Sequence, residues 1–176
     1  MPEIRKATEA EIKAVNAIYE HILTQEECGR AHIGWVRGVY PTEQTAREAW
    51  QAGELFVLTE GGSVCAAARI NQTQVPEYAG TRWSEPEADP AQVMVLHTLV
   101  VDPACAGRGY GTAFVGFYEQ YALEHGCPYL RMDTNEKNQA ARRLYARLGY
   151  READIVPCVF NGIADVRLVC LEKTLR

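Results

Sequence analysis

The sequence predicts one α/β (α+β) domain with a mixed sheet, and three observations lead to this fold class. Short segments rich in Val, Ile and Leu have the length and patterning of strands, while other segments repeat apolar residues at helical spacing. The predicted order is β-α-α-β-β-β-α-β-α-β-β, with no internal repeat or linker. The length of 176 residues suits one domain with a sizeable core, so we expect a single domain over residues 1–176.

The first predicted elements are a short strand and a long amphipathic helix. Ile4–Ala7 has the composition of a strand. Thr8 and Glu11 have the spacing of a capping box, which places the start of a helix at Glu9. Helical spacing gives this segment one buried face, made of Ile12, Val15, Ile18, Tyr19 and Ile22.

An irregular segment, Cys28–Tyr40, separates this helix from a second one. Thr42 is a favourable N-cap and predicts a helix over Glu43–Ala52. Trp35 and Tyr40 in the irregular segment are either packing anchors or part of a substrate pocket, because aromatic side chains serve both purposes.

A hairpin and a long loop follow the second helix. Leu55–Thr59 and Val64–Asn71 are predicted to be strands joined by a turn at Gly61–Gly62. Thr73–Gln92 contains three prolines and four acidic residues and is predicted to be a long surface loop. Its acidic side chains either attract an amine or form a solvated face.

The chain is organised around the next stretch, in which a strand runs into a glycine-rich turn. Val93–Val101 is a β-rich apolar run, and Asp102 and Pro103 end it. The turn Gly107–Gly111 then leads into an amphipathic helix that Gly126 ends. Such a unit can hold phosphate, because glycines let the backbone approach closely and the first-turn N–H groups of a helix are free.

The C-terminal part contains one more strand and helix and then a final pair of strands. Tyr129–Thr134 is predicted to be a strand and Asn138–Leu148 a helix. Tyr150–Ala153 and Val166–Leu171 are predicted to be the last two strands, with a hairpin turn at Asn161–Gly162 between them.

Composition and charge exclude several classes of protein. No apolar run approaches the ~20 residues that span a bilayer, and the polar N-terminal segment lacks a signal-peptide core, so we expect a cytoplasmic protein with no membrane partner. A net charge of −5 without a basic stripe argues against nucleic acid and mildly favours a cationic or neutral substrate. The six cysteines form no CxxC pair, which predicts reduced thiols and no metal site.

Two common phosphate-binding motifs fit the glycine turn poorly. A P-loop requires a lysine directly after its last glycine, and no lysine follows here. A dinucleotide fingerprint requires a third glycine where Thr112 stands, and it usually opens the first βαβ unit of a chain. The glycine turn alone therefore does not identify the ligand.

Three motifs over about residues 95–150 carry more information together. They are Leu99-Val100-Val101-Asp102-Pro103, the glycine turn, and Asn138-x-x-Ala141-x-x-Leu144-Tyr145-x-x-Leu148-Gly149-Tyr150. Together they resemble the GCN5-related N-acetyltransferase (GNAT) superfamily, and the order of elements resembles it over nearly the whole chain. The resemblance implies a mixed, mostly antiparallel sheet of about seven strands with about four flanking helices. Its central strands are implied to splay apart to admit acetyl-CoA.

The resemblance also implies which residues bind acetyl-CoA as the cosubstrate. The backbone of Leu99 and Val101 would pair with the pantetheine arm, as an added strand does, and Asn138 would contact the arm. The family pattern has Arg or Gln where this chain has Ala106, so that side-chain contribution is absent. The CoA pyrophosphate is implied to bind the backbone around the glycine turn, which comprises Ala106, Gly107, Arg108, Gly109, Tyr110, Gly111 and Thr112.

Two side chains are candidates for proton transfer. His97 is the candidate base because the unperturbed pKa of histidine is about 6.5, near neutrality. In a regular strand His97 would share the face of Leu99 and Val101, although a bulge would change that relation. It resembles a histidine that serves in proton removal in arylalkylamine acetyltransferases, although the second histidine of that pattern is replaced by Val95; the alternative for His97 is a structural, hydrogen-bonded role. Tyr145 is implied to lie near the thiol and to protonate the leaving thiolate, and its spacing also suits a core residue.

The sequence therefore predicts an acetyl-CoA-dependent N-acetyltransferase that acts on a primary amine of a small molecule. Transfer is expected by direct attack in a ternary complex, without a metal. A protein or peptide N-acetyltransferase acting on an N-terminus or a lysine is an open alternative, and so is an acyl-CoA-binding module with little catalysis. Many relatives are dimers, which implies a homodimer by analogy.

Overall fold

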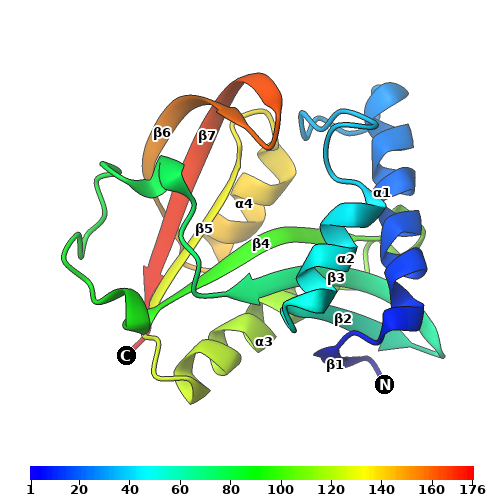
Figure 1. The fold of residues 1–176 in the computed structure, drawn as a ribbon, viewed down its shortest axis with the longest axis horizontal. Helices are drawn as coiled ribbons and strands as arrows, with labels where there is room; N and C mark the ends of the chain where they lie inside the picture. Colours follow the sequence, from blue (N-terminus) through cyan, green and yellow to red (C-terminus); the bar gives the residue numbers. More distant parts are fainter.

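Residues 1–176 form one α/β domain in the computed structural model, which confirms the predicted fold class (Figure 1). The seven-stranded sheet has the order β1-β2-β3-β4-β5-β7-β6, and only β4 and β5 run parallel. The strands are β1 (Glu3–Lys6), β2 (Leu55–Glu60), β3 (Ser63–Asn71), β4 (Val93–Val101), β5 (Tyr129–Asn135), β6 (Arg151–Phe160) and β7 (Ile163–Thr174). The helices are α1 (Ile12–Glu27), α2 (Glu43–Gln51), α3 (Tyr110–Glu124) and α4 (Gln139–Arg147).

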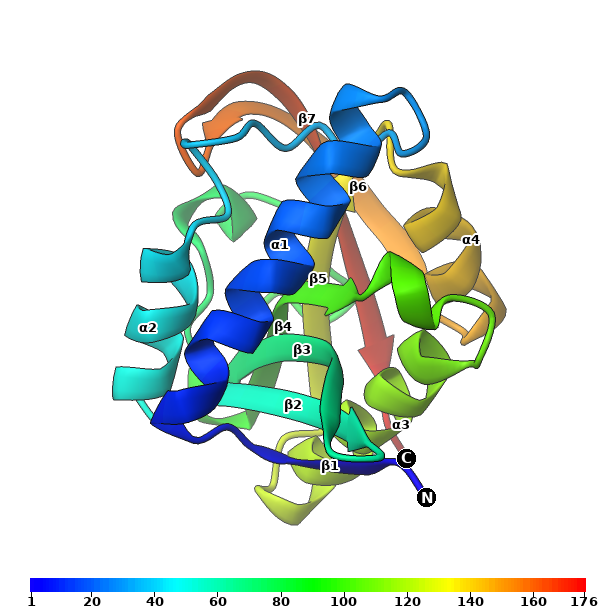
Figure 2. The ribbon, with the colours of Figure 1, turned by 90° about the vertical axis from the view of Figure 1, so that its right-hand side faces the viewer.

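Helices cover both faces of the sheet and divide the core into separate clusters (Figure 2). On one face, α1 and α2 pack over a cluster that includes Val57 and Val100. On the other face, α3 and α4 pack over a cluster that includes Phe114 and Met132. Each helix thereby buries its apolar stripe against the sheet. None of the helices has the length and apolar content needed to span a bilayer.

The predicted capping box at Thr8 forms, and the predicted N-cap Thr42 forms a capping box with Thr45. The Thr8 N–H donates to Glu11 Oε2 at 2.8 Å, but the first turn, Glu9–Glu11, is a 3₁₀ turn, and α1 proper begins at Ile12. Thr42 caps α2, and its N–H donates to Thr45 Oγ1 at 3.0 Å. Local polar side chains therefore fix where both helices start.

The last two strands are longer than predicted, because β6 and β7 extend to the turn at Asn161–Gly162. Pro157 lies within β6, and a proline usually ends a strand because it lacks an N–H donor. β6 is the edge strand of the sheet, so the missing donor on its outer side costs no ladder hydrogen bond.

The central pair, β4 and β5, separates after a short stretch of pairing. Their register runs from Val93 opposite Tyr129 to Leu96 opposite Met132, and the two strands then diverge, as Figure 1 shows. Strands that stop pairing leave a gap through the sheet. This gap is the feature around which the functional site is built.

A bulge in β4 reassigns side chains at the edge of this gap. Thr98 has a φ of 52°, and three residues of β4 span the distance of two residues on β3. As a result, Leu99 and Val101 pack on the α3 face, whereas Val100 packs on the α1 face. The bulge overturns the expectation, made for a regular strand, that His97 shares the face of Leu99 and Val101.

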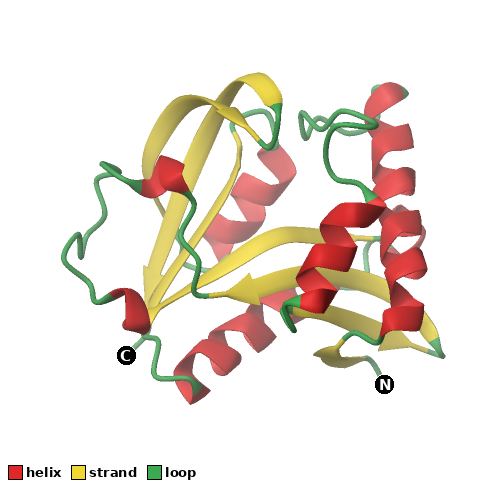
Figure 3. Ribbon diagram, viewed as in Figure 1, coloured by secondary structure: helices red, strands yellow, loops and turns green.

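The loop over residues 72–92 lies at the surface, as predicted, but two of its aromatic side chains pack against the sheet. The loop contains two short helical turns, visible in Figure 3, and its Tyr78 and Trp83 are buried. The guanidinium of Arg131 lies 4.4 Å from the centroid of the Trp83 ring, and Arg131 Nη2 donates to Glu85 O at 2.9 Å. Aromatic burial and one buried arginine therefore anchor the loop on β5.

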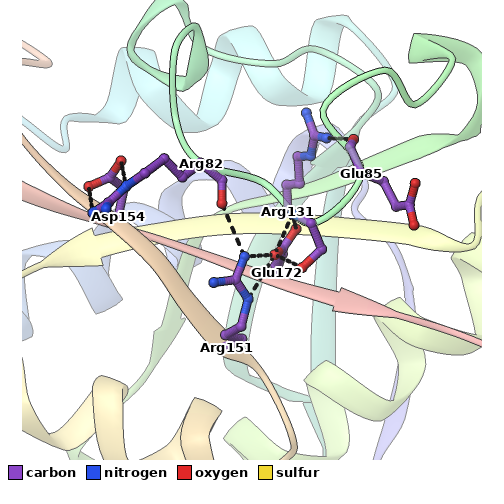
Figure 4. A network of polar contacts seen from close by, with 7 residues as sticks. Arg82, Glu85, Arg131, Arg151, Asp154 and Glu172 are labelled. Atoms are coloured by element: carbon purple, nitrogen blue, oxygen red, sulfur yellow. Dashed lines mark hydrogen bonds and ion pairs between the residues drawn. The ribbon is translucent and has the colours of Figure 1, made fainter.

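Glu172 on β7 ties the loop to β6 (Figure 4). Its carboxylate accepts from Ser84 N at 2.9 Å, from Ser84 Oγ at 2.7 Å and from Arg151 Nε at 3.0 Å. Burial alone would raise the pKa of Glu172, but the hydrogen bonds from Ser84 and Arg151 outweigh it and hold this pKa below its ordinary value.

We expect Glu172→Gln to lower the free energy of unfolding by about 2–3 kcal/mol, because it removes charge-assisted hydrogen bonds from a buried site. Urea unfolding at neutral pH measures the change. Glu136→Gln is the matched control, because Glu136 pairs with Arg167 at the surface, and there the expected change is below about 1 kcal/mol. Equal losses in the two variants would contradict an anchoring role for Glu172.

Candidate active site

The glycine turn presents a row of unpaired backbone N–H groups. Gly107 and Gly109 have φ angles of 77° and 75°, in the left-handed region that favours glycine, and Gly109 is the N-cap of α3. The N–H groups of residues 107–112 have no hydrogen-bond acceptor within the protein, and the first bond of the helix runs from Ala113 N to Gly109 O at 3.0 Å. Consecutive free donors at a helix N-terminus form a site for an anion such as a pyrophosphate.

Beside this turn, the free edge of β4 offers backbone groups to an extended ligand. The Asp102 N–H donates to Cys65 O on β3 at 2.8 Å, and the direction of backbone hydrogen bonding alternates along an antiparallel strand. The N–H and C=O groups of Leu99 and Val101 therefore point away from β3, into the gap left by β5. An extended arm can pair with this edge as an added strand does.

A cavity of about 520 Å³ fills the gap between β4 and β5, and we name it the first cavity. Its volume lies in the range of small-molecule and cofactor sites. It brings together many of the predicted site residues, namely Trp35, Tyr40, Leu99, Val101, Ala106, Gly111, Asn138 and Tyr145. The remaining predicted residues of the glycine turn adjoin Ala106 and Gly111 in the chain without lining the cavity.

Asn138 and Tyr145 reach the first cavity from the two ends of α4. Asn138 caps the helix, since its Oδ1 accepts from Ala141 N at 3.2 Å, and its amide NH₂ group has no partner in the protein. Tyr145 is 6% exposed, and its hydroxyl also has no partner in the protein. Burial first, and the charge of Asp133 second, raise the pKa of Tyr145, so its phenol is a proton donor at neutral pH.

Arg108 and Tyr110 turn away from the gap, toward β2. Arg108 Nη1 lies 3.4 Å from Glu60 Oε2, and the Tyr110 hydroxyl donates to the same carboxylate. In this arrangement the Arg108 side chain does not take the place of the one missing at Ala106. The donors that the turn leaves free for an anion are therefore backbone N–H groups.

A second cavity, of about 360 Å³, lies on the α1 and α2 face of the sheet. Its wall combines α1, α2, β3 and β4 with the turn between β6 and β7. The two cavities adjoin where they share five lining residues, and we name this boundary the passage: Tyr40, Thr98, Asp133, Phe160 and Asn161. A group that extends through the gap from the first cavity reaches the second one at this passage.

Tyr40 lies at the passage as part of a small aromatic and polar cluster. Its ring meets that of Trp35 edge-on, with centroids 5.9 Å apart, and its hydroxyl hydrogen-bonds to Thr98 Oγ1. Burial raises the pKa of Tyr40 to about 12, although the Thr98 hydrogen bond lowers it; the charge of Asp133 raises it further and that of Arg69 lowers it. The charges of Asp133 and Arg69 therefore both influence the Tyr40 hydroxyl at the passage.

His97 lies on the wall of the second cavity as a neutral hydrogen-bond donor. Its Nε2 is 2.7 Å from Asn71 Oδ1, and Asn71 Nδ2 donates to Glu54 at 3.0 Å, which fixes the amide and makes the imidazole the donor. Burial, and then the charge of Arg69, lower the pKa of His97 to about 4. A group with this pKa is a weak proton acceptor at neutral pH.

Asp133 on β5 is a candidate that the sequence reasoning missed. It follows directly after Met132, the last residue of β5 that pairs with β4, and it lines both cavities. Burial raises the pKa of Asp133 to about 6, although a hydrogen bond from the Tyr78 hydroxyl, 2.6 Å from Oδ2, opposes this shift. The sequence could have indicated Asp133, because it is the one carboxylate in the strand that was expected to separate from its neighbour. Its partner Tyr78 comes from a distant loop and carries no such signal.

Splayed strands, a free strand edge and an anion-binding turn together define the class of an acyltransferase that takes CoA in extended form. Residues 16–150 match the model of the acetyltransferase (GNAT) family. This match covers well over half of the chain, so the protein belongs to the GNAT acetyltransferase family.

Curated relatives match parts of the chain. An uncharacterized N-acetyltransferase of Methanocaldococcus jannaschii is 32% identical over 77 residues, which cover 43% of this chain and 49% of the relative. A second uncharacterized N-acetyltransferase of the same organism is 34% identical over 65 residues, which cover 37% of this chain and 29% of the relative. The matched segments thus span at most about half the length of these relatives.

Solved structures match the whole fold. A GNAT-family acetyltransferase of Streptococcus agalactiae has a TM-score of 0.80 at 23% identity, with 99% of this chain and 96% of that chain covered. The yncA protein of Salmonella typhimurium, solved with its cofactor acetyl-CoA, has a TM-score of 0.70 at 22% identity, with 100% and 95% covered. At these identities the likeness shows the GNAT fold.

Proposed function

We propose that this protein is an acetyl-CoA-dependent N-acetyltransferase that transfers an acetyl group to a primary amine of a small molecule. One observation carries the proposal: the glycine turn and the free edge of β4 lie along one cavity, and that cavity adjoins a second one at Asp133. Acetyl-CoA would occupy the first cavity and the acceptor the second. The amine and the thioester would then meet at the passage.

On the acetyl-CoA side, the pyrophosphate would bind the free N–H groups of residues 107–112. The pantetheine arm would pair with Leu99 and Val101, and the Asn138 amide would donate to it. A backbone N–H near Leu99 would polarise the thioester carbonyl, where negative charge develops during attack. Main-chain groups serve most of these contacts, which is compatible with alanine at position 106.

On the acceptor side, the amine must lose a proton to attack the carbonyl carbon. Asp133 and His97 are the two candidates for the base, and both line the second cavity. The pKa of Asp133, raised to about 6, suits a base at neutral pH better than the pKa of His97, lowered to about 4. We therefore assign the base to Asp133 and a positioning role to His97.

As the C–S bond breaks, the thiolate of CoA must gain a proton. Tyr145 lines the first cavity with a protonated, unpartnered hydroxyl, which supports its role as the general acid. Direct attack by the amine needs no covalent enzyme intermediate. Over the cycle, the proton that leaves the amine balances the proton delivered to the thiolate.

The shape of the acceptor side supports a small molecule over a protein substrate. The second cavity holds about 360 Å³ and is bounded by α1, α2 and the β6–β7 turn. A peptide acceptor needs a groove that continues past the reacting amine, whereas a confined pocket suits a whole small molecule. Acetylation of a protein N-terminus or lysine is therefore the second candidate function.

We expect acetyl-CoA, and neither NAD nor ATP, to raise the melting temperature. At ~100 times its Kd, acetyl-CoA should add about 2.7 kcal/mol, a shift of several degrees for a domain of this size. Gly109→Ala should abolish the shift, because a side chain disfavours the left-handed φ that aims the N–H groups. Gly126→Ala is the control, since Gly126 has a φ of 71° at the far end of α3. A shift retained by Gly109→Ala would place the phosphate elsewhere.

Tyr145→Phe should lower kcat by about 100-fold or more while acetyl-CoA affinity stays nearly unchanged, because the hydroxyl acts on the leaving thiolate. Thiol release measures kcat, and calorimetry measures affinity. Tyr150→Phe is the matched control, because Tyr150 is also a buried tyrosine but lies outside both cavities, and it loses only a hydrogen bond to Glu119. Parallel losses of kcat and affinity in Tyr145→Phe would make Tyr145 a packing residue.

The pH profile of kcat/KM should separate the two candidate bases. With Asp133 as the base, kcat/KM rises as pH increases through about 6, since the carboxyl must be deprotonated to accept a proton. Asp133→Asn should remove this ionisation and lower kcat by about 100-fold or more, whereas His97→Gln should retain it. If His97→Gln removes the ionisation and Asp133→Asn keeps it, the assignment to Asp133 is wrong.

A further inference from the structure

Three polar residues form a row across the floor of the second cavity. Arg69 on β3 lies opposite His97 on β4, and Asp133 follows Met132, the residue that pairs with Leu96. All three point to the same face of the sheet, because their neighbours Ala68, Leu96 and Met132 pack on the other face. The row thus places a cation at one end, a neutral donor in the middle and a carboxyl at the passage.

Arg69, at the cationic end of the row, has hydrogen-bond donors without a partner in the protein. Arg69 Nε donates to Glu54 at 2.5 Å, and this contact orients the guanidinium. Its two Nη groups have no hydrogen-bond partner in the protein, although Arg69 lines the cavity and its side chain is only 34% exposed. A planar guanidinium with a free edge is suited to bind a carboxylate through two parallel hydrogen bonds.

A second unpartnered donor faces the same cavity from α1. Tyr19 is 2% exposed and lines the second cavity, yet its hydroxyl makes no hydrogen bond within the protein. That hydroxyl also retains accessible surface, since it is not among the fully enclosed unpaired atoms. Buried hydroxyls normally make a hydrogen bond, so a hydroxyl without a partner on a cavity wall is available to bind a ligand.

The two ends of the row lie on strands that are two positions apart in the sheet, Arg69 on β3 and Asp133 on β5. Paired strands would place their Cα atoms about 10 Å apart, and because β4 and β5 diverge after Met132, the separation is at least about this large. The side chains shorten the span that a ligand must bridge. The other acidic side chain on the wall, Glu48, lies at the exposed rim and accepts from Gln44 at 3.1 Å, away from the row.

We propose that the acceptor is a small aminocarboxylate, an amino acid in the broad sense. Its carboxylate would bind Arg69 and Tyr19, and its amine would lie at Asp133, facing the thioester. The inference rests on the proposed acetyltransferase function and specifies its substrate class. It refines the expectation from net charge, because such a molecule is neutral overall while carrying both charges.

The test compares each candidate amino acid with an analogue that lacks only the negative charge of the carboxylate. Straight-chain α- and ω-amino acids are compared with their carboxamides as acceptors, with thiol release from acetyl-CoA as the readout. We expect kcat/KM for the preferred amino acid to exceed that of its carboxamide by about 100-fold, since the site is built to bind an anion. Arg69→Gln should reduce this ratio toward one.

Two further variants test the role of Tyr19 and control for the loss of an ion-paired arginine. Tyr19→Phe removes one donor without changing the packing shape, and it should lower kcat/KM for the amino acid about tenfold. Arg47→Gln is the matched control: Arg47 is also ion-paired and 33% exposed, but it lies outside both cavities. It should leave the ratio between acid and carboxamide unchanged.

The outcomes separate this inference from the function on which it rests. Equal turnover of acids and carboxamides, or a ratio that Arg69→Gln does not alter, would overturn the aminocarboxylate and leave the acetyltransferase intact. Turnover of amines that lack a carboxylate, without turnover of amino acids, would also overturn the aminocarboxylate and leave the acetyltransferase intact. If acetyl-CoA neither stabilises the protein nor releases thiol with any acceptor, the proposed function itself fails.

Discussion

The end of hydrogen bonding between β4 and β5 after Leu96 is the constraint on which the rest of the structure depends. A sheet that stops pairing in its middle leaves two edges of unpaired backbone, which is costly unless something else satisfies them. Here the edges line a cavity that passes from one face of the sheet to the other. The long β6–β7 hairpin, the loop after α1 and α4 enclose it, so much of the molecule serves to hold the two halves of the sheet apart and to cover the gap.

The bulge at Thr98 allows one strand to serve both sides of that gap. Without the extra residue, His97, Leu99 and Val101 would share a face; with it, His97 faces the second cavity while Leu99 and Val101 pack on the α3 face. The left-handed backbone at Thr98 is a local cost, and the hydrogen bond between its side chain and Tyr40 helps to compensate it. The left-handed backbone at Thr98 thus lies at the passage, where the proposed reaction would take place.

The sequence was a good guide where local chemistry decides the structure. The capping box at Thr8, the N-cap at Thr42, the bounds of β4 and the turn at Asn161–Gly162 were all predictable, because side chains close in sequence determine them. Features that depend on distant partners were not. Pro157 in β6 is tolerated only because β6 is an edge strand, the burial of Tyr78 and Trp83 depends on β5 and β7, and the raised pKa of Asp133 depends on enclosure by segments far away in the chain.

The two sides of the gap differ in which part of the chain makes the contacts. On the turn side, the donors are main-chain N–H groups, whose positions depend on backbone conformation and survive most side-chain changes. On the second-cavity side, the candidate contacts are side chains of Tyr19, Arg69 and Asp133, which single substitutions can replace. The fold therefore has an invariable half and an adaptable half. A lineage of such proteins can acquire new acceptors one residue at a time while the handling of its donor molecule stays the same.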